Sequence, residues 1–156
     1  MRIGKRNLSK LEGRLLFPVD HQEKMQMMML HSCWFICTGL EFYFFGKALE
    51  GLLLYVGVVI LTFTQYIRYL TMKYLGTYWV PYPVAFSGQK IIKTGPYRLM
   101  KHPNYLVVIM EVALVPLMGR AYFSAGVFSL LNLIFLKRRV ELEERALAGV
   151  ESFVTR

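Results

Sequence analysis

The chain has 156 residues, a length typical of one domain. Hydrophobic residues make up 55% of it and charged residues 19%, which excludes an intrinsically disordered chain. Lys and Arg total 19 against 10 acidic residues, so nucleic acid, an acidic partner and a membrane surface all remain open until the positions of the charges are considered.

Residues 1–24 are polar and basic, and they contain no apolar run as long as the core of a signal peptide. Four apolar runs follow, at 25–46, 51–67, 105–119 and 121–136. A spanning helix needs about 20 apolar residues, with a range of about 17–25, and the last two runs are slightly short. They either span a membrane with help from flanking aromatic, Lys and Arg side chains, or form a helical hairpin buried in a soluble protein.

The positions of the Lys and Arg residues favour the membrane. Six lie in 1–24, one in 47–50, six in 68–104, one in 119–121 and five in 137–156. Cytoplasmic segments of membrane proteins carry the excess of Lys and Arg, whereas a soluble bundle has no reason to alternate in this way. The pattern predicts an all-α integral membrane protein with about four transmembrane helices, a helical hairpin in the C-terminal half, and both termini in the cytoplasm.

This organisation makes the chain a single domain. Its expected parts are a cytoplasmic arm at 1–24, two helices at 25–67, a cytoplasmic loop at 68–104, the hairpin at 105–136 and a cytoplasmic tail at 137–156. Cys33 and Cys37 lie four residues apart in the first helix and lack the further ligands of a zinc site, so no metal site is expected.

Two charged segments flank the expected hairpin. The first, GPYRLMKHPNY at 95–105, combines two cations, a histidine and two prolines directly before an apolar run. The second, RVELEERAL at 139–147, places three glutamates between two arginines directly after the last run. Each also has a simpler interpretation, because basic and aromatic residues anchor loops at the membrane surface and charge-rich helix ends are often only solvated. Pro and Gly residues prevent 68–104 from forming one helix, and 87–90 is an expected turn.

Together the two segments resemble those of the isoprenylcysteine carboxyl methyltransferase family and, more loosely, of the membrane phospholipid N-methyltransferases. The family pattern is a GPYR-x-x-RHP-x-Y run, a helical hairpin and an R-x-x-x-E-E-x-x-L run, and Lys101 replaces the arginine of RHP here. The resemblance covers about 68–147. The N-terminal half is similar to bacterial members, including relatives of enzymes that methylate alkylpyrones or alkylresorcinols, and this similarity suggests a bacterial inner membrane.

The resemblance implies transfer of a methyl group from S-adenosyl-L-methionine, bound in a pocket on the cytoplasmic side. The residues implied in cofactor binding are Gly95, Pro96, Tyr97, Lys101, His102, Pro103, Tyr105, Glu143 and Glu144. A carboxylate acceptor needs only a cation to position it, and Arg98 or Lys101 is the candidate. A hydroxyl acceptor also needs a base, for which His102 is the candidate. Glu111 lies inside an apolar run and either orients the substrate, pairs with Arg98, or is a neutral structural residue.

We therefore expect an O-methyltransferase whose acceptor is lipophilic, either a prenylated carboxylate or the hydroxyl of a polyketide lipid, and which meets membrane lipid but no nucleic acid. The acceptor's lipid tail would enter sideways between helices. The alternative is a non-catalytic membrane scaffold or lipid-binding protein that retains the fold. A homodimer is compatible with the sequence.

Overall fold

The computed structural model describes residues 2–14, 21–45, 49–81, 84, 86 and 92–154. Every element within these residues is an α-helix or a 3-10 helix, which confirms the expected all-α class. Short helices occupy the N-terminal arm and the segments between the long helices: α1 (Arg2–Leu11), η1 (Glu12–Arg14), η2 (Gly76–Tyr78) and η3 (Gly95–Arg98). The turn expected at 87–90 lies outside the described residues.

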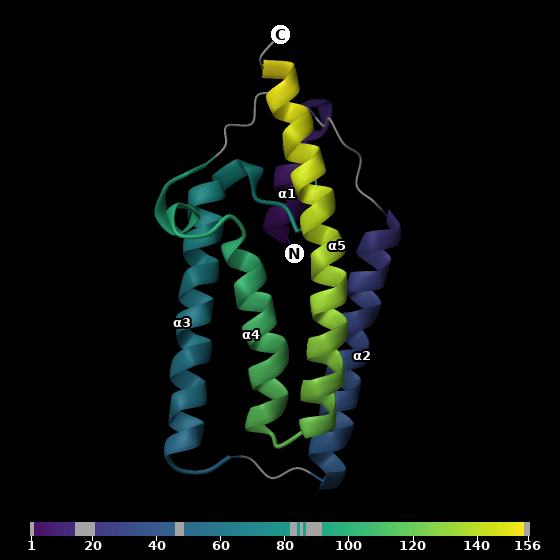
Figure 1. Cartoon of the computed structure of the whole chain (residues 1–156), viewed down its shortest axis with the longest axis vertical. Helices are drawn as coiled ribbons and strands as arrows, with labels where there is room; N and C mark the ends of the chain where they lie inside the picture. Colours follow the sequence, from purple (N-terminus) through teal and green to yellow (C-terminus); the bar gives the residue numbers. More distant parts are fainter. Residues whose placement is uncertain are drawn as a thin grey trace.

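Four long helices run side by side along the molecule: α2 (His21–Phe45), α3 (Leu52–Leu75), α4 (Pro103–Met118) and α5 (Tyr122–Val154). Figure 1 shows α4 and α5 in the middle, with α3 beside α4 and α2 beside α5. The packing agrees, since the most extensive contacts join α4 to α5, α3 to α4, and α2 to α5. α4 and α5 form a hairpin around a tight turn in which Arg120 has a positive φ of 55°.

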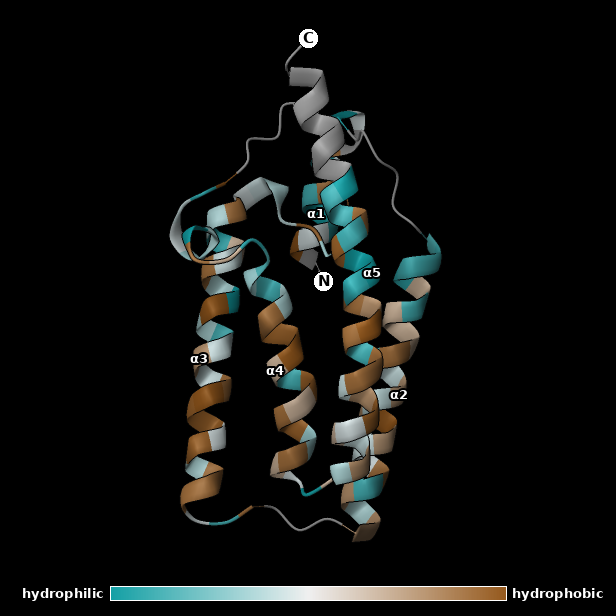
Figure 2. Ribbon diagram, in the orientation of Figure 1, coloured by the Kyte–Doolittle hydropathy of each residue, from teal (hydrophilic) through white to brown (hydrophobic). Residues whose placement is uncertain are grey.

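One helical segment of the described chain, Leu52–Tyr78, is long and apolar enough by length and composition to cross a membrane. α4 is apolar but shorter. Large apolar side chains on the outside of the bundle are nevertheless highly exposed, including Phe45 at 85% and Phe35 at 67%. Figure 2 shows hydrophobic residues concentrated in the half of the bundle away from the C-terminus. The four-span topology stays a prediction.

Two helices extend beyond the ends that the apolar runs suggested. α3 continues past 67 to Leu75, because the next break is Gly76, whose positive φ of 55° ends the helix. α5 continues past 136 through Val154, because most of residues 137–145 are Lys, Arg and Glu, which are charged and also good helix formers. The end of an apolar run therefore marks the point where a helix passes from apolar to aqueous surroundings, and not the point where the helix ends. α3 therefore includes the first residues of the segment 68–104 that was expected to form a loop, and α5 runs on into the segment expected to form the tail. The cytoplasmic location of both segments stays a prediction.

The core of the bundle lies between α2, α4 and α5. It is built by Met27, Leu30, Trp34, Val112, Phe128 and Leu136. The indole nitrogen of Trp34 donates a hydrogen bond to the backbone oxygen of Val112 at 3.2 Å, which fixes α2 against α4. At the opposite end of α2 from its start, the carboxylate of Glu41 accepts hydrogen bonds from the backbone N–H groups of Phe123 and Ser124, at 2.9 and 2.8 Å. Glu41 thus caps the N-terminus of α5 from a neighbouring helix.

Candidate active site

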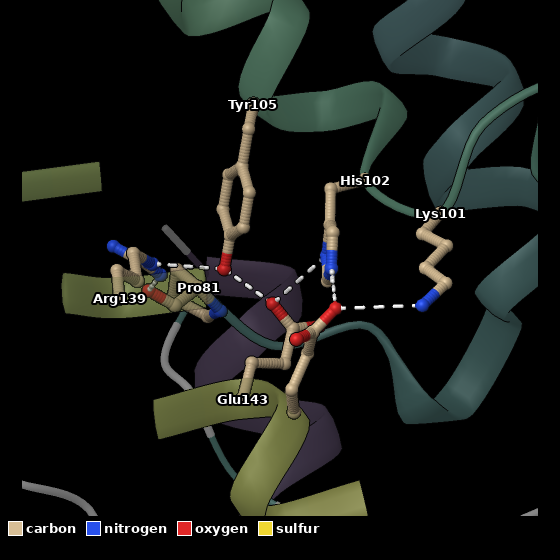
Figure 3. A network of polar contacts seen from close by, with 7 residues as sticks. Pro81, Lys101, His102, Tyr105, Arg139 and Glu143 are labelled. Atoms are coloured by element: carbon tan, nitrogen blue, oxygen red, sulfur yellow. Dashed lines mark hydrogen bonds and ion pairs between the residues drawn. The ribbon is translucent and has the colours of Figure 1, made fainter. Parts of the chain in front are cut away.

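The two charged segments meet at one end of the bundle. The first continues from η3 into the start of α4, where Pro103 occupies the first helical position and suits it because a proline lacks the N–H that would be unpaired there. The second is the part of α5 that extends past the apolar run. Because α4 and α5 form a hairpin, His102 and Glu143 face each other although 41 positions separate them (Figure 3).

His102 lies between two carboxylates. Its Nδ1 is 3.5 Å from Oε2 of Glu143, and its Nε2 is 3.6 Å from Oε1 of Glu144. Lys101 Nζ is also 3.6 Å from the same Glu144 oxygen. The hydroxyl of Tyr105 donates a hydrogen bond to Oε2 of Glu143. The rings of His102 and Tyr105 are stacked, with their centroids 5.2 Å apart.

These contacts shift the ionisation of the pair in opposite directions. The hydrogen bond to Glu143 raises the pKa of His102 above its ordinary value, although burial opposes the shift. Burial also opposes ionisation of Glu143, but hydrogen bonds from His102 and Tyr105 outweigh it and lower the pKa of that carboxyl. Burial and the nearby Glu143 charge raise the pKa of Tyr97, which stays neutral. The pair therefore favours a protonated His102 beside an ionised Glu143.

Arg139 joins four separate parts of the chain at this site. Its Nε donates to the Tyr105 hydroxyl at 3.3 Å, and its Nη2 donates to the backbone oxygen of Pro81 at 2.6 Å (Figure 3). Its Nη1 lies 3.2 Å from Oε1 of Glu23, at the start of α2. The guanidinium also lies over the Tyr105 ring, 5.6 Å from the centroid. A planar group with several fixed donors suits this multiple role better than an ammonium would.

A cavity of about 670 Å³ opens beside this network. The predicted cofactor-binding residues that line it are Tyr97, Lys101, His102, Pro103, Tyr105 and Glu143. Residues that sequence reasoning did not assign to the site also line it: Glu23, Arg68, Trp79, Pro81 and Arg139. Glu23 is an acidic residue in a basic arm, and nothing in the sequence relates it to Arg139. Pro81 contributes a backbone oxygen, which leaves no sequence signal.

Five predicted site residues do not line this cavity: Gly95, Pro96, Arg98, Glu111 and Glu144. Arg98 is exposed, and Glu144 reaches the site only through His102 and Lys101. Gly95 has a positive φ of 60°, and a Cβ at that position would lie 2.5 Å from the Tyr74 ring. This glycine is therefore required by the packing of η3 on α3, whatever its relation to a cofactor.

A second cavity of about 600 Å³ lies between α2, α3 and α4. Its walls are mostly apolar, and it shares His31, Arg68 and Val108 with the first cavity, so the two adjoin. At the junction, Nη2 of Arg68 lies 2.5 Å from Oε2 of Glu111, and the amide of Gln65 donates to the other oxygen of this carboxylate. Glu111 therefore pairs with Arg68, which corrects the pairing with Arg98 that was one of the alternatives for this residue. The reason is that α3 is still helical at 68 and brings Arg68 alongside α4.

Residues 56–149 match the model of the isoprenylcysteine carboxyl methyltransferase (ICMT) family, a range that contains both charged segments and most of α3, α4 and α5. Among curated proteins, the chain is similar to the uncharacterized protein YpbQ of Bacillus subtilis (strain 168), with 33% identity over 149 residues, which cover 94% of this chain and 87% of the relative. No solved structure matches the chain. The chain therefore belongs to the isoprenylcysteine carboxyl methyltransferase family, a membership that indicates a methyltransferase and, together with the apolar segment Leu52–Tyr78, a membrane protein.

Proposed function

We propose that this protein is an S-adenosylmethionine-dependent O-methyltransferase that acts on a lipophilic, membrane-resident acceptor. The observation that carries the proposal is the junction of two cavities at Arg68. One cavity has several charged side chains in its lining, with His102 and Glu143 among them, and the other is mostly apolar and lies between the helices. A site with charged groups for a charged cofactor, next to an apolar site for a lipid tail, is the arrangement that such a reaction needs.

The residues around the first cavity fit the proposed cofactor. Its volume of about 670 Å³ lies within the range of about 300–1,000 Å³ that is common for small-molecule sites. S-adenosylmethionine carries a sulfonium, an ammonium, a carboxylate and an adenine, and when bound it supplies an electrophilic methyl group. Ionised Glu143 suits the cationic groups, Lys24 and Lys101 suit the carboxylate, and the rings of Tyr97 and Trp79 suit the adenine.

Methyl transfer needs alignment and exclusion of water more than covalent help. Arg68 is well placed to orient the acceptor oxygen. Its guanidinium is held by Glu111, whose other oxygen accepts a hydrogen bond from Gln65, and its buried Nε has no hydrogen-bond partner. It takes the positioning role for which the sequence had suggested Arg98 or Lys101; Arg98 is exposed and does not line the cavity. An acidic acceptor needs no base, and this suits a His102 whose pKa is raised by its hydrogen bond to Glu143.

The lipid tail of the acceptor would lie in the second cavity. Val58 and Leu61 of α3, Val115 of α4, and Trp34 and Phe35 of α2 provide its apolar walls. α2 and α3 flank this space and share no extensive contact, so a tail has a lateral route into it. We place the polar end of the bundle on the cytoplasmic side of a bacterial inner membrane, because the Lys- and Arg-rich segments lie at that end.

Calorimetric titration of the detergent-solubilised protein with S-adenosylhomocysteine tests the cofactor site. We expect micromolar binding that is lost in His102→Ala and Glu143→Ala and kept in Lys93→Ala, an exposed residue that lines neither cavity. Failure of the folded wild-type protein to bind would overturn the methyltransferase proposal and favour a non-catalytic membrane protein. A second assay then follows transfer of a labelled methyl group into an extract of membrane lipids, where Arg68→Ala should lose transfer.

A further inference from the structure

The N-terminal helix α1 has two faces of different chemistry. Gly4, Asn7, Leu8 and Leu11 recur at helical spacing and are buried or half-buried. The opposite face carries exposed side chains, three of which are cationic: Lys5, Arg6 and Lys10. No acidic residue occurs between Arg2 and Leu11. One face therefore attaches α1 to the protein, and the other presents uncompensated positive charge.

The attachment of α1 is specific. The side-chain amide of Asn7 donates to the backbone oxygens of Gly76 and Trp79, at 3.1 and 2.8 Å. Gly4 lies so close to Pro81 that a Cβ there would overlap the proline ring. Leu11 packs in a small cluster with Val84 and Phe86. These contacts hold α1 against the segment that directly follows α3, so its cationic face has a fixed position.

That position is at the level where lipid headgroups are expected. α1 packs on η2, at the polar end of the candidate span Leu52–Tyr78. The same end of α3 carries the exposed tyrosines Tyr69 and Tyr74, and tyrosines are enriched at the boundary between lipid tails and water. The cationic face of a helix at this level would be within reach of the phosphate groups of a bilayer surface.

We propose that the face of α1 formed by Lys5, Arg6 and Lys10 is a binding site for the phosphate groups of anionic phospholipids. The complementarity of charge is direct, because three cations lie on a fixed helix with no acidic neighbour on that helix. Each Lys or Arg near an anionic membrane surface strengthens its attraction about fivefold. The site is separate from the two cavities, and none of the three cations lines either of them.

Occupation of this site also supports the wall of the first cavity. α1 contacts Trp79 and Pro81, which both line that cavity, and the backbone oxygen of Pro81 accepts a hydrogen bond from Arg139. A lipid that holds α1 in place therefore stabilises the segment that holds Arg139. A ligand that binds only the folded protein raises its thermal unfolding temperature.

The test compares the full-length protein in phosphatidylcholine nanodiscs with and without phosphatidylglycerol. We expect phosphatidylglycerol to raise the unfolding temperature of the wild type and to have little effect on the triple variant Lys5→Gln, Arg6→Gln, Lys10→Gln. The control triple variant Lys93→Gln, Lys137→Gln, Arg138→Gln removes the same charge from exposed residues near the same end and should keep most of the wild-type response. Native mass spectrometry of protein released from the discs should find a clearly larger loss of retained phosphatidylglycerol for the α1 variant than for the control.

Equal losses in the two triple variants would overturn the proposal, because they would show a diffuse attraction rather than a site on α1. The same conclusion follows if phosphatidylglycerol fails to stabilise the wild type, or if inorganic phosphate in neutral discs stabilises it as strongly. None of these measurements uses methyl transfer. They are therefore independent of the proposed catalytic function, which the titration with S-adenosylhomocysteine tests separately.

Discussion

Nδ1 of His102 lies 3.5 Å from Oε2 of Glu143, the oxygen that also accepts the hydrogen bond of Tyr105. This contact joins the start of α4 to the charged extension of α5 and places the His102–Glu143 pair on the wall of the first cavity. Because each partner shifts the pKa of the other, the pair is the part of the site whose chemistry is most open to direct measurement.

Replacement of Glu143 with Gln should lower the pKa of His102 toward its ordinary value. The reason is that the hydrogen bond to Glu143 is the largest cause of the upward shift. NMR titration of the histidine ring in a labelled sample measures the pKa. Glu144→Gln is the matched control and should have a smaller effect, because the Glu144 side chain is 50% exposed and lies at 3.6 Å. An effect of Glu144→Gln as large as that of Glu143→Gln would contradict the assigned pairing.

The same pair predicts how stability depends on pH. The pKa of His102 is raised above 6.5, so its stabilising contribution is complete below 6.5 and is lost as the pH rises through the higher folded-state value. The pKa of Glu143 is lowered below 4.5, so its contribution is present above 4.5 and is lost as the pH falls through the lower folded-state value. The thermal unfolding temperature should therefore decline on the alkaline side of 6.5 more steeply in the wild type than in His102→Gln. If the unfolding temperature fell equally steeply with pH above 6.5 in both proteins, the contacts of His102 with Glu143 and Glu144 would not stabilise the fold.

Arg68 and Arg98 provide a second direct comparison. Arg68→Ala should abolish methyl transfer and should also destabilise the protein by about 1–3 kcal/mol, because it leaves the partly buried Glu111 without its cation. Arg98→Ala should change neither property much, since Arg98 is exposed and lines neither cavity. Both variants are measured for unfolding in detergent and for transfer of a labelled methyl group. Loss of transfer in Arg98→Ala with an active Arg68→Ala would restore the assignment suggested by the sequence.

The fold was largely predictable from the sequence, and the site only in part. Apolar runs identify the long helices because burial and lipid contact both require apolar side chains. The runs end where charged residues begin, whereas α3 and α5 continue as helices beyond that point. His102 and Glu143 could be predicted to meet because their segments flank one hairpin. The pairing of Arg68 with Glu111 could not, since it depends on the extra turns of α3 beyond 67. The bond from Arg139 to the backbone of Pro81 has no sequence signal at all.

Gly95 is expected to tolerate no side chain. Its φ of 60° costs an alanine about 1–2 kcal/mol, and a Cβ would also meet the Tyr74 ring. Gly95→Ala should therefore lower the unfolding temperature and weaken binding of S-adenosylhomocysteine, because η3 carries Tyr97 into the cavity wall. Gly39→Ala is a matched control in a regular helix with open space around it. The double variant Gly95→Ala, Tyr74→Ala removes the steric overlap and should recover part of the lost unfolding temperature. If it recovers none, the whole effect of Gly95→Ala comes from backbone conformation.

Glu41 should matter for stability and not for the cofactor. Its carboxylate accepts the first N–H groups of α5, at the opposite end of the bundle from His102. Loss of a helix cap costs about 1 kcal/mol, so Glu41→Ala should lower the unfolding temperature. Its affinity for S-adenosylhomocysteine, measured where the variant is fully folded, should equal that of the wild type, because α5 keeps its packing against α4 and its charged extension is more than twelve residues away along the same helix. Glu41→Gln keeps one oxygen as an acceptor, so its unfolding temperature should lie between those of the wild type and Glu41→Ala.

A Glu41→Ala protein that folds but binds S-adenosylhomocysteine weakly would contradict this prediction. It would show that the cap sets the position of α5 along its axis and thereby the distance between Glu143 and His102.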